Sequence, residues 1–348
     1  MNSELIDLRS DTVTRPCKSM RKHMYNAEVG DNFYREDKIT QELEEYCAEY
    51  FGKEAALFTI SGTMGNQIAL RTYIQPGNEI ILDASYHINY YEYSATALLG
   101  GSINLLHTPN GIIYEKDLLQ ALNSRYRSAL TGKPKLICLE NTINYHSGKI
   151  YPLVTFQEIA SLSKKNDLRV YLDGARLLNA CVALKVSVLE YTTYVDSLII
   201  SFSKGLGAPM GAVLLGNKDF IEEARKYQKW YGGGLHQSGI IAAAALFAIK
   251  HNINKLEQDN INAKILANLL SEEKKIKVNL DEIQTNIVMF SFQNTIINVE
   301  KFIELAKQQG ILLYPWDHNT VRAVTHQNVC ENQIKKAAYK ISQMMAEL

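Results

Sequence analysis

The segment Ser201-Phe202-Ser203-Lys204-Gly205-Leu206-Gly207-Ala208-Pro209-Met210-Gly211 places a lysine on a glycine-rich bend directly after an apolar run, residues 195–200. A lysine in such a place either extends its ammonium group into water or stays inside with a lowered pKa, where its free amine attacks carbonyl groups. The second behaviour is that of a Schiff-base lysine, whereas the first is ordinary for a lysine on a surface turn. Other parts of the chain decide between the two.

The sequence around this bend alternates between strand-like and helical patterns. We expect strands at residues 54–60, 79–82, 102–106, 135–139 and 169–172, and helices at 67–73, 86–99, 114–121, 155–164 and 188–191. This alternation predicts an α/β fold with a mostly parallel central sheet, covered by helices on both faces. Ahead of it, residues 1–35 are predicted to form an ordered arm and residues 37–51 a surface helix.

The composition changes after Gly232-Gly233-Gly234. A long helical stretch, 240–270, precedes strand patterns at 287–292 and 321–324 and a helix pattern at 299–308, which is typical of a smaller α+β domain. The predicted boundary lies near residue 250: residues 1–250 form the arm plus the large domain, and residues 251–348 form the small C-terminal domain.

The composition excludes several classes of protein. The 348 residues carry 37 Lys plus Arg against 37 Asp plus Glu, so no overall charge attracts nucleic acid or an anionic membrane. The five cysteines lack the spacing of a disulfide framework or a zinc site, and neither a signal peptide nor a run of membrane-spanning length is present. We therefore expect a cytoplasmic protein without a metal site and without nucleic-acid or membrane partners.

Five polar segments follow the predicted strands, and ligand sites in such sheets lie at the carboxyl ends of the strands. They are residues 61–63, 83–87, 140–144, 173–176 and 201–204. In the first of them, Ser61-Gly62-Thr63, unpaired N–H groups at a helix start converge with two hydroxyl groups, as in a phosphate pocket. Taken alone, the same turn also fits an ordinary helix cap.

Single side chains in these segments suggest further roles, each with an alternative. Asp173 ends an apolar strand and needs a partner, which is either a protonated pyridine nitrogen or Arg176. His87 either stacks on a flat ring or is an ordinary histidine. Arg176 and Arg322 lie at strand ends in different domains and suit a bidentate grip on a carboxylate, although surface ion pairs are the common alternative.

Taken together with several other motifs, these residues give the sequence a resemblance to the threonine aldolase and aromatic amino acid β-eliminating lyase family. Members of that family are pyridoxal-phosphate enzymes with the aspartate aminotransferase-like fold, fold type I. The resemblance covers most of the chain and rests on Ile6-Asp7-Leu8-Arg9-Ser10-Asp11-Thr12-Val13-Thr14, Val29-Gly30-Asp31, Gly52-Lys53-Glu54-Ala55-Ala56, Ser61-Gly62-Thr63, Leu139-Glu140-Asn141-Thr142, Asp173-Gly174-Ala175-Arg176, Ser203-Lys204-Gly205-Leu206-Gly207 and Gly232-Gly233-Gly234.

The resemblance implies that the cofactor is pyridoxal 5'-phosphate and that Lys204 holds it as a Schiff base. It implies that the phosphate binds at the turn Ser61-Gly62-Thr63, that His87 stacks on the ring and that Asp173 meets the pyridine nitrogen. Lys204, His87 and Asp173 are thus the predicted catalytic residues.

The same resemblance implies how an amino-acid substrate is held. Ser10, Arg176 and Arg322 are expected to receive its carboxylate, with Arg176 also belonging to the cofactor site. Enzymes of this family are dimers or tetramers with sites at the subunit interface, so we expect a homodimer or homotetramer. Tyr34 matches a family position near that interface.

The implied reaction is retro-aldol cleavage of a β-hydroxy-α-amino acid, of the threonine or allo-threonine type, to glycine and an aldehyde. Where the family has Glu-Asn-Thr-His-Asn, this chain has Glu140-Asn141-Thr142-Ile143-Asn144, so an apolar side chain replaces the imidazole expected near the substrate hydroxyl. β-Elimination, racemisation or a specialised biosynthetic reaction on another amino acid therefore stays open as the alternative. A cofactor-binding protein without turnover is the third hypothesis.

Three further points accompany that substitution. His146, three residues after Ile143, either replaces the missing imidazole or faces solvent. His236 stands where the family has Arg after the triple glycine, and Tyr93-Ser94 stands where it has Ala-Gly after Glu92. His236 is expected to alter a contact to the phosphate or to a neighbouring subunit. Tyr93-Ser94 is expected to reduce the space beside the helix that carries His87.

Overall fold

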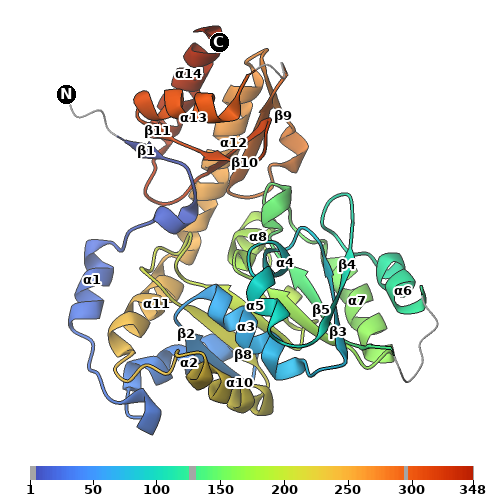
Figure 1. Ribbon diagram of the computed structural model, residues 1–348. Helices are drawn as coiled ribbons and strands as arrows, with labels where there is room; N and C mark the ends of the chain where they lie inside the picture. Colours follow the sequence, from blue (N-terminus) through green and yellow to red (C-terminus); the bar gives the residue numbers. More distant parts are fainter. Residues whose placement is uncertain (1–4, 125–130, 294–296, 348) are drawn as a thin grey trace.

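The computed structural model describes residues 5–124, 131–293 and 297–347 (Figure 1). Within them, the larger sheet has seven strands. Strand β8 runs antiparallel to both of its neighbours, while the pairs β3/β4, β3/β5, β5/β6 and β6/β7 are parallel, which confirms the mostly parallel sheet. In sheet order the strands are β2 (Ala55–Thr59), β8 (Ala212–Gly216), β7 (Ser197–Ser201), β6 (Arg169–Asp173), β5 (Lys133–Glu140), β3 (Asn78–Asp83) and β4 (Ser102–Leu106).

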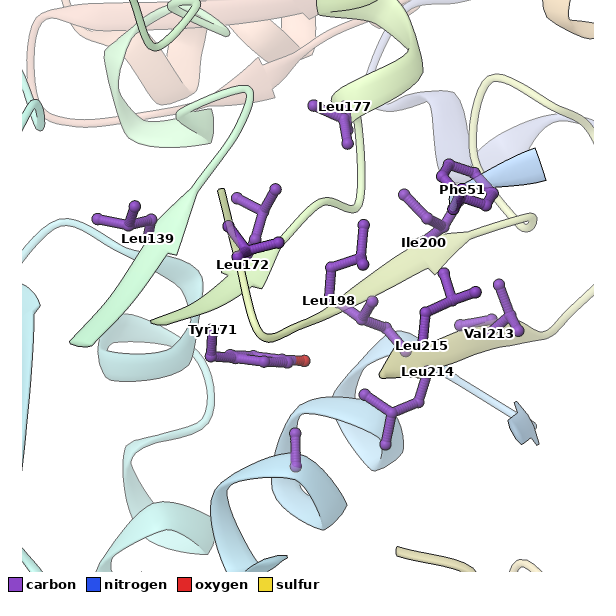
Figure 2. Close-up of a cluster of buried hydrophobic side chains, with 14 of the residues drawn as sticks. Phe51, Leu139, Tyr171, Leu172, Leu177, Leu198, Ile200, Val213, Leu214 and Leu215 are labelled. Carbon is purple, nitrogen blue, oxygen red and sulfur yellow. The ribbon is translucent and has the colours of Figure 1, made fainter. Parts of the chain in front are cut away.

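Both faces of this sheet are buried at its central strands β6, β7 and β8. Tyr171 and Leu172, neighbours on β6, lie on opposite sides of the sheet and are both fully buried (Figure 2). Because both faces are buried, the sequences of these strands are continuously apolar and do not alternate between apolar and polar residues. The helices of the large unit are α2 (Lys38–Tyr50), α3 (Gly62–Tyr73), α4 (His87–Tyr90), α5 (Tyr93–Ala97), α6 (Glu115–Asn123), α7 (Leu153–Lys165), α8 (Leu177–Leu184), α9 (Leu189–Thr192), α10 (Lys218–Trp230) and α11 (Gly239–His251).

The C-terminal part contains a second, antiparallel sheet in the strand order β12-β13-β10-β9. Its strands are β9 (Ile276–Val278), β10 (Ile287–Phe292), β12 (Tyr314–Pro315) and β13 (Thr320–Val324). The helices that accompany it are α12 (Leu256–Ser271), α13 (Val299–Gln308) and α14 (Glu331–Glu347). A large α/β unit with a smaller C-terminal α+β unit is the fold class that the sequence predicted.

The N-terminal arm contacts the small unit. Strand β1 (Ile6–Asp7) pairs in parallel with β11 (Ile311–Leu312), and Leu8 joins Ile6 in the apolar core of the C-terminal part. The arm also contains a helix, α1 (Lys18–Tyr25), which the sequence reading did not assign. The boundary near residue 250 stays a prediction.

The prediction of one continuous helix at residues 86–99 is wrong. The pattern at residues 86–99 forms two short helices, α4 and α5, separated at Tyr91 and Glu92. Glu92 is buried there and accepts hydrogen bonds from Asn66 and Gln67 of α3, and these tertiary contacts interrupt the helix. In the part of the chain described, no helix is both long and apolar enough to span a bilayer.

Candidate active site

One pocket collects residues from all five polar segments selected from the sequence. Each segment follows a strand of the large sheet, so the folding of that sheet brings together side chains that are far apart in the chain. The pocket is lined by Gly62, Thr63, Asn66, His87, Glu140, Thr142, Asn144, Asp173, Ala175, Arg176, Ser201, Ser203 and Lys204.

Lys204 lies in this pocket, on the bend that follows β7. The backbone of the bend is fixed by Thr14, whose Oγ1 donates to the Lys204 carbonyl oxygen at 2.8 Å, and by Gly207, whose φ of 78° favours glycine. Burial, and then the positive charge of Arg176, lower the pKa of Lys204. The amine is therefore closer to its neutral, nucleophilic form than a surface lysine is.

Asp173 and His87 are linked by a chain of hydrogen bonds. The Nδ2 of Asn66 donates to Asp173 Oδ2 and to Glu92 Oε1, both at 2.9 Å. The Nδ1 of His87 lies 2.9 Å from the same Glu92 oxygen. Burial by itself lowers the pKa of His87, but the hydrogen bond to Glu92 and the charge of Asp173 raise it overall. The network fixes the imidazole and the carboxylate in the same pocket.

The carboxyl group of Glu140 connects the loop after β3 with the loop after β5 by hydrogen bonds. Its Oε2 accepts from the backbone N–H of His87 at 2.5 Å, and its Oε1 accepts from that of Asn144 at 2.8 Å. Burial, and then the neighbouring Asp173, raise the pKa of Glu140 to about 7. A carboxyl group with such a pKa exchanges protons near neutral pH.

The two predicted carboxylate-binding arginines meet at Asn144. Arg176 donates to Asn144 Oδ1 through Nη1 at 3.4 Å, and Arg322 donates to the same oxygen through its own Nη1 at 3.1 Å. The other nitrogens of Arg176 hold Asp11 in a buried bidentate pair, with both distances 2.7 Å. Asp11, rather than Asp173, is thus the ion-pair partner of Arg176, and the guanidinium keeps the pKa of Asp11 well below its ordinary value despite burial.

Ser10 and Arg322 lie beside the pocket rather than in its lining. Ser10 caps a short 3-10 helix, where its Oγ accepts from Thr12 N–H at 3.3 Å. Arg322 donates to the carbonyl oxygen of Arg9, and its buried Nε has no hydrogen-bond partner among the described residues. A buried N–H without an acceptor is costly, so this nitrogen is suited to an incoming anion.

The start of α3 contributes Gly62 and Thr63 to the lining of the pocket. Ser61 Oγ accepts from Met64 N–H at 3.1 Å, and the N–H groups of Gly62 and Thr63 belong to the first helical turn, which has no acceptor within the helix. A Cβ added at Gly62 would meet no atom within 4 Å, so open space lies against the backbone there. The cap is therefore present at this turn, and N–H groups in such a place suit an anion.

The departures from the family pattern occupy different places. Ile143 is fully buried and packs against Gly111, while its neighbours Thr142 and Asn144 line the pocket. His146 also contacts Gly111, and burial lowers its pKa. The exposed His236 pairs with Asp31 of the same chain at 2.9 Å.

The residues of this site that received no individual role in the sequence analysis include Asp11, Asn66, Glu92, Glu140 and Asn144. Asn144 ends a segment that the strand-end rule selected, so its position carried a signal. Asn66 lies one helical turn after Gly62, on the helix that starts at the predicted phosphate turn, which was a second, weaker signal. The local pattern gave no individual role to Asp11 or Glu92, because Arg176 and Asn66, their respective partners, lie 165 and 26 positions away.

Comparison with known proteins places this site in a family. The family model described as β-eliminating lyase matches residues 7–293. The low-specificity L-threonine aldolase of Escherichia coli is 37% identical over 96% of this chain and 97% of its own length, and low-specificity L-threonine aldolase 1 of Arabidopsis thaliana is 37% identical over 94% and 93%.

A solved structure shares the fold. The threonine aldolase of Leishmania major superposes with a TM-score of 0.84, at 19% sequence identity, over 97% of this chain and 99% of that one. Fold, motifs and relatives agree with the resemblance predicted from the sequence, and the chain belongs to the β-eliminating lyase family of pyridoxal-phosphate-dependent enzymes.

Proposed function

We propose that this protein is a pyridoxal-phosphate-dependent carbon-carbon lyase that cleaves β-hydroxy-α-amino acids of the threonine or allo-threonine type to glycine and an aldehyde. The observation that carries the proposal is the convergence of Lys204, Asp173, His87 and the α3 N-terminus in one pocket, with two arginines at its edge. The low-specificity L-threonine aldolases that match nearly the whole chain support the choice of reaction.

The residues of the pocket fit the cofactor. Lys204 supplies an amine of lowered pKa, Asp173 a fixed carboxylate for a pyridine nitrogen, and His87 a flat ring held by Glu92. The first turn of α3 supplies N–H groups for a phosphate beside open space. Thr142 also lines the pocket, and its buried Oγ1 lacks a hydrogen-bond partner among the described residues.

When bound, pyridoxal phosphate supplies an electron sink for the pair left on Cα. The residues of the chain position the substrate for that chemistry. Asn144, with Arg176 and Arg322, is placed to hold the α-carboxylate, because both guanidinium groups converge on its side chain. Asp11 keeps the Arg176 guanidinium fixed, and Lys204 would hold the cofactor through its side-chain amine.

Cleavage requires a group that takes the proton of the β-hydroxyl. Ile143 has no such group, whereas Glu140 of the same segment lines the pocket and has a pKa of about 7. We assign proton acceptance to Glu140, with His87 as the other nearby titratable group. Mutation of Glu140 to Gln should lower kcat by about two orders of magnitude and remove a titration near pH 7 from the rate profile.

Location and assembly belong to the same proposal. All five cysteines are free, which supports the predicted cytoplasmic location. A homodimer or homotetramer with its sites at the subunit interface is the proposed assembly, with Tyr34, which is 69% exposed, at that interface.

The decisive test is a product assay on the purified protein with added pyridoxal phosphate. Incubation with L-allo-threonine should release glycine and acetaldehyde, and borohydride should fix the cofactor on the Lys204 peptide in mass spectrometry. Lys204→Ala should lose both properties. Release of a keto acid and ammonia would indicate elimination instead, and exchange of the α-hydrogen with the carbon skeleton intact would indicate racemisation. Absence of cofactor on Lys204 would refute the proposal altogether.

A further inference from the structure

Three consecutive carbonyl oxygens of the bend that carries Lys204 each accept a hydrogen bond from a side chain of another segment. We call the three donor side chains the bend clamp. The pairs are Thr14 Oγ1 with the oxygen of Lys204 at 2.8 Å, Gln327 Nε2 with that of Gly205 at 3.1 Å, and Asn252 Nδ2 with that of Leu206 at 2.7 Å. The conformation of the bend therefore depends on residues that lie far away in the sequence.

The bend clamp joins parts of the chain that lie outside the large sheet. Thr14 belongs to the N-terminal arm, and Asn252 is the C-terminal cap of α11. Gln327 follows strand β13 of the small sheet. Strand β7 brings the chain to the pocket, but the arm and the C-terminal part complete the hydrogen bonding of the bend.

Gln327 contacts the bend at a second position, Gly207. A Cβ added at Gly207 would overlap Nε2 of Gln327, so the missing side chain leaves room for the amide group. The Gly207 N–H also donates to the Lys204 carbonyl oxygen at 2.9 Å and closes the turn there. The Gln327 amide is therefore packed against the turn that begins at Lys204.

The backbone next to Gln327 is held independently of the Gln327 side chain. Thr325 Oγ1 donates to the Asp259 carbonyl oxygen at 2.6 Å, and His326 Nε2 lies 2.8 Å from the carbonyl oxygen of Asp7 in the arm. Thr325 and His326 are buried, whereas Gln327 is half-buried. A substitution of Gln327 should therefore leave the loop in place and remove only its contact with the bend.

We infer that Gln327 is a positioning residue for Lys204: from the C-terminal part of the chain it fixes the Gly205 carbonyl group, and with it the direction in which the Lys204 amine enters the pocket. The inference rests on the proposed function, because it requires that this amine bonds to the aldehyde of the cofactor. Gln327 lies outside the lining of the pocket, so it acts through the bend and not on a ligand.

The test compares pyridoxal 5'-phosphate with pyridoxine 5'-phosphate, which has the same ring and phosphate but an alcohol in place of the aldehyde. Only the aldehyde bonds to the Lys204 amine, with loss of water. The dissociation constant of pyridoxine 5'-phosphate divided by that of pyridoxal 5'-phosphate, which we call the aldehyde ratio, therefore measures how well the amine is placed. Calorimetry on the cofactor-free protein gives both constants.

The ratio is measured for the wild type and for three variants. Gln327→Leu removes the donor and keeps a side chain of similar size. Lys204→Ala marks the ratio without the amine. Gln308→Leu is the matched control, because this glutamine is exposed on the last turn of α13 in the same part of the chain.

We expect Gln327→Leu to reduce the aldehyde ratio about threefold to tenfold, because part of the binding free energy then goes into ordering a loosened bend. The constant for pyridoxine 5'-phosphate should stay near its wild-type value. Gln308→Leu should keep the wild-type ratio, and Lys204→Ala should bring it near one. In the cofactor-free protein, hydrogen exchange of the Gly207 amide should be about threefold to tenfold faster in Gln327→Leu.

The outcomes separate this inference from the proposed function. An unchanged aldehyde ratio in Gln327→Leu, with a wild-type ratio well above that of Lys204→Ala, would overturn the inference alone. Equal losses of affinity for both compounds would show a merely structural role and would overturn it as well. A wild-type ratio no higher than that of Lys204→Ala would refute the proposed function. Faster Gly207 exchange in Gln327→Leu would in that case still show that Gln327 fixes the bend, and unchanged exchange would refute this too.

Discussion

Asp259, on α12, carries a buried carboxyl group that the proposed chemistry does not use. Its Oδ2 has no hydrogen-bond partner among the described residues, and a Cβ added at Gly205, next to Lys204, would lie 3.8 Å from it. Burial and the charge of Asp11 raise the pKa of Asp259 to about 8. The native protein therefore holds this acid in its neutral form at pH 7, because an unpaired buried charge is costly.

Replacement of Asp259 by Asn should make stability less dependent on pH. A carboxyl group whose pKa is higher in the native than in the unfolded state stabilises the fold fully below its ordinary pKa, near 4, and this contribution is lost as the pH rises to 8. The amide does not titrate. We expect Asp259→Asn to be more stable than the wild type by about 1–3 kcal/mol at pH 8 and nearly equal to it at pH 4.5, by urea unfolding.

The exposed Asp281→Asn is the matched control and should show a small difference from the wild type at both pH values. A difference between Asp259→Asn and the wild type that is the same at pH 4.5 and pH 8 would show that Asp259 is ionised in the native state.

Single residues of the site differ in how far the sequence reveals them. Lys204 and Asp173 could be selected from the sequence, because Asp173 ends an apolar strand and Lys204 follows another on a glycine-rich bend, and a charged group buried in such a place needs a partner. Asp11 and Asn66 were not, because their roles depend on hydrogen bonds to residues 165 and 107 positions away. Local pattern does not encode such pairs, although each one decides how a predicted residue is oriented.

At the scale of elements, α3 shows both the success and the limit of pattern reading. The sequence predicts a helix at residues 67–73 after a phosphate turn, but the helix already begins at Gly62. Two glycines in its first turns weaken the helical pattern, while the cap at Ser61 starts the helix. The start inside the motif is what directs the first N–H groups into the pocket.

The two glycines of α3 should respond differently to substitution by alanine. A Cβ at Gly65 would overlap Cδ1 of the buried Ile199 on β7, whereas a Cβ at Gly62 meets open space. Gly65→Ala should lower the free energy of unfolding by about 1–2 kcal/mol. This value is the cost of overpacking minus the gain in helix propensity. Gly62→Ala should leave stability unchanged or slightly higher. Urea unfolding of the apo proteins measures both, and equal shifts would show that α3 does not pack tightly on the sheet.

At the scale of the whole molecule, the arrangement of strands and helices was predictable, while the contact of the N-terminal arm with the small sheet was not. The arm pairs through only two residues, Ile6 and Asp7, too few for a strand pattern.

The surface carries a further feature of this scale. Phe33, Tyr34 and Trp230 are 64%, 69% and 71% exposed, and the segments that carry them are joined by a hydrogen bond from Asn32 N–H to the His236 carbonyl oxygen.

Such exposed rings on joined segments are typical of a surface that another protein covers. Lys229 Nζ lies 5.3 Å from the Phe33 ring centroid, so the residues near Phe33 and Trp230 form one region around the start of the arm and the end of α10. We therefore expect the double variant Phe33→Asp/Tyr34→Asp to dissociate the proposed oligomer, because two carboxylates buried at an apolar interface cost more than the interface gains. Sedimentation equilibrium should show a mass reduced to that of a smaller assembly or a single chain, while circular dichroism stays native. Tyr339→Asp, on the exposed side of α14, should keep the wild-type mass, and an unchanged mass in the double variant would place the subunit contact on another face of the protein.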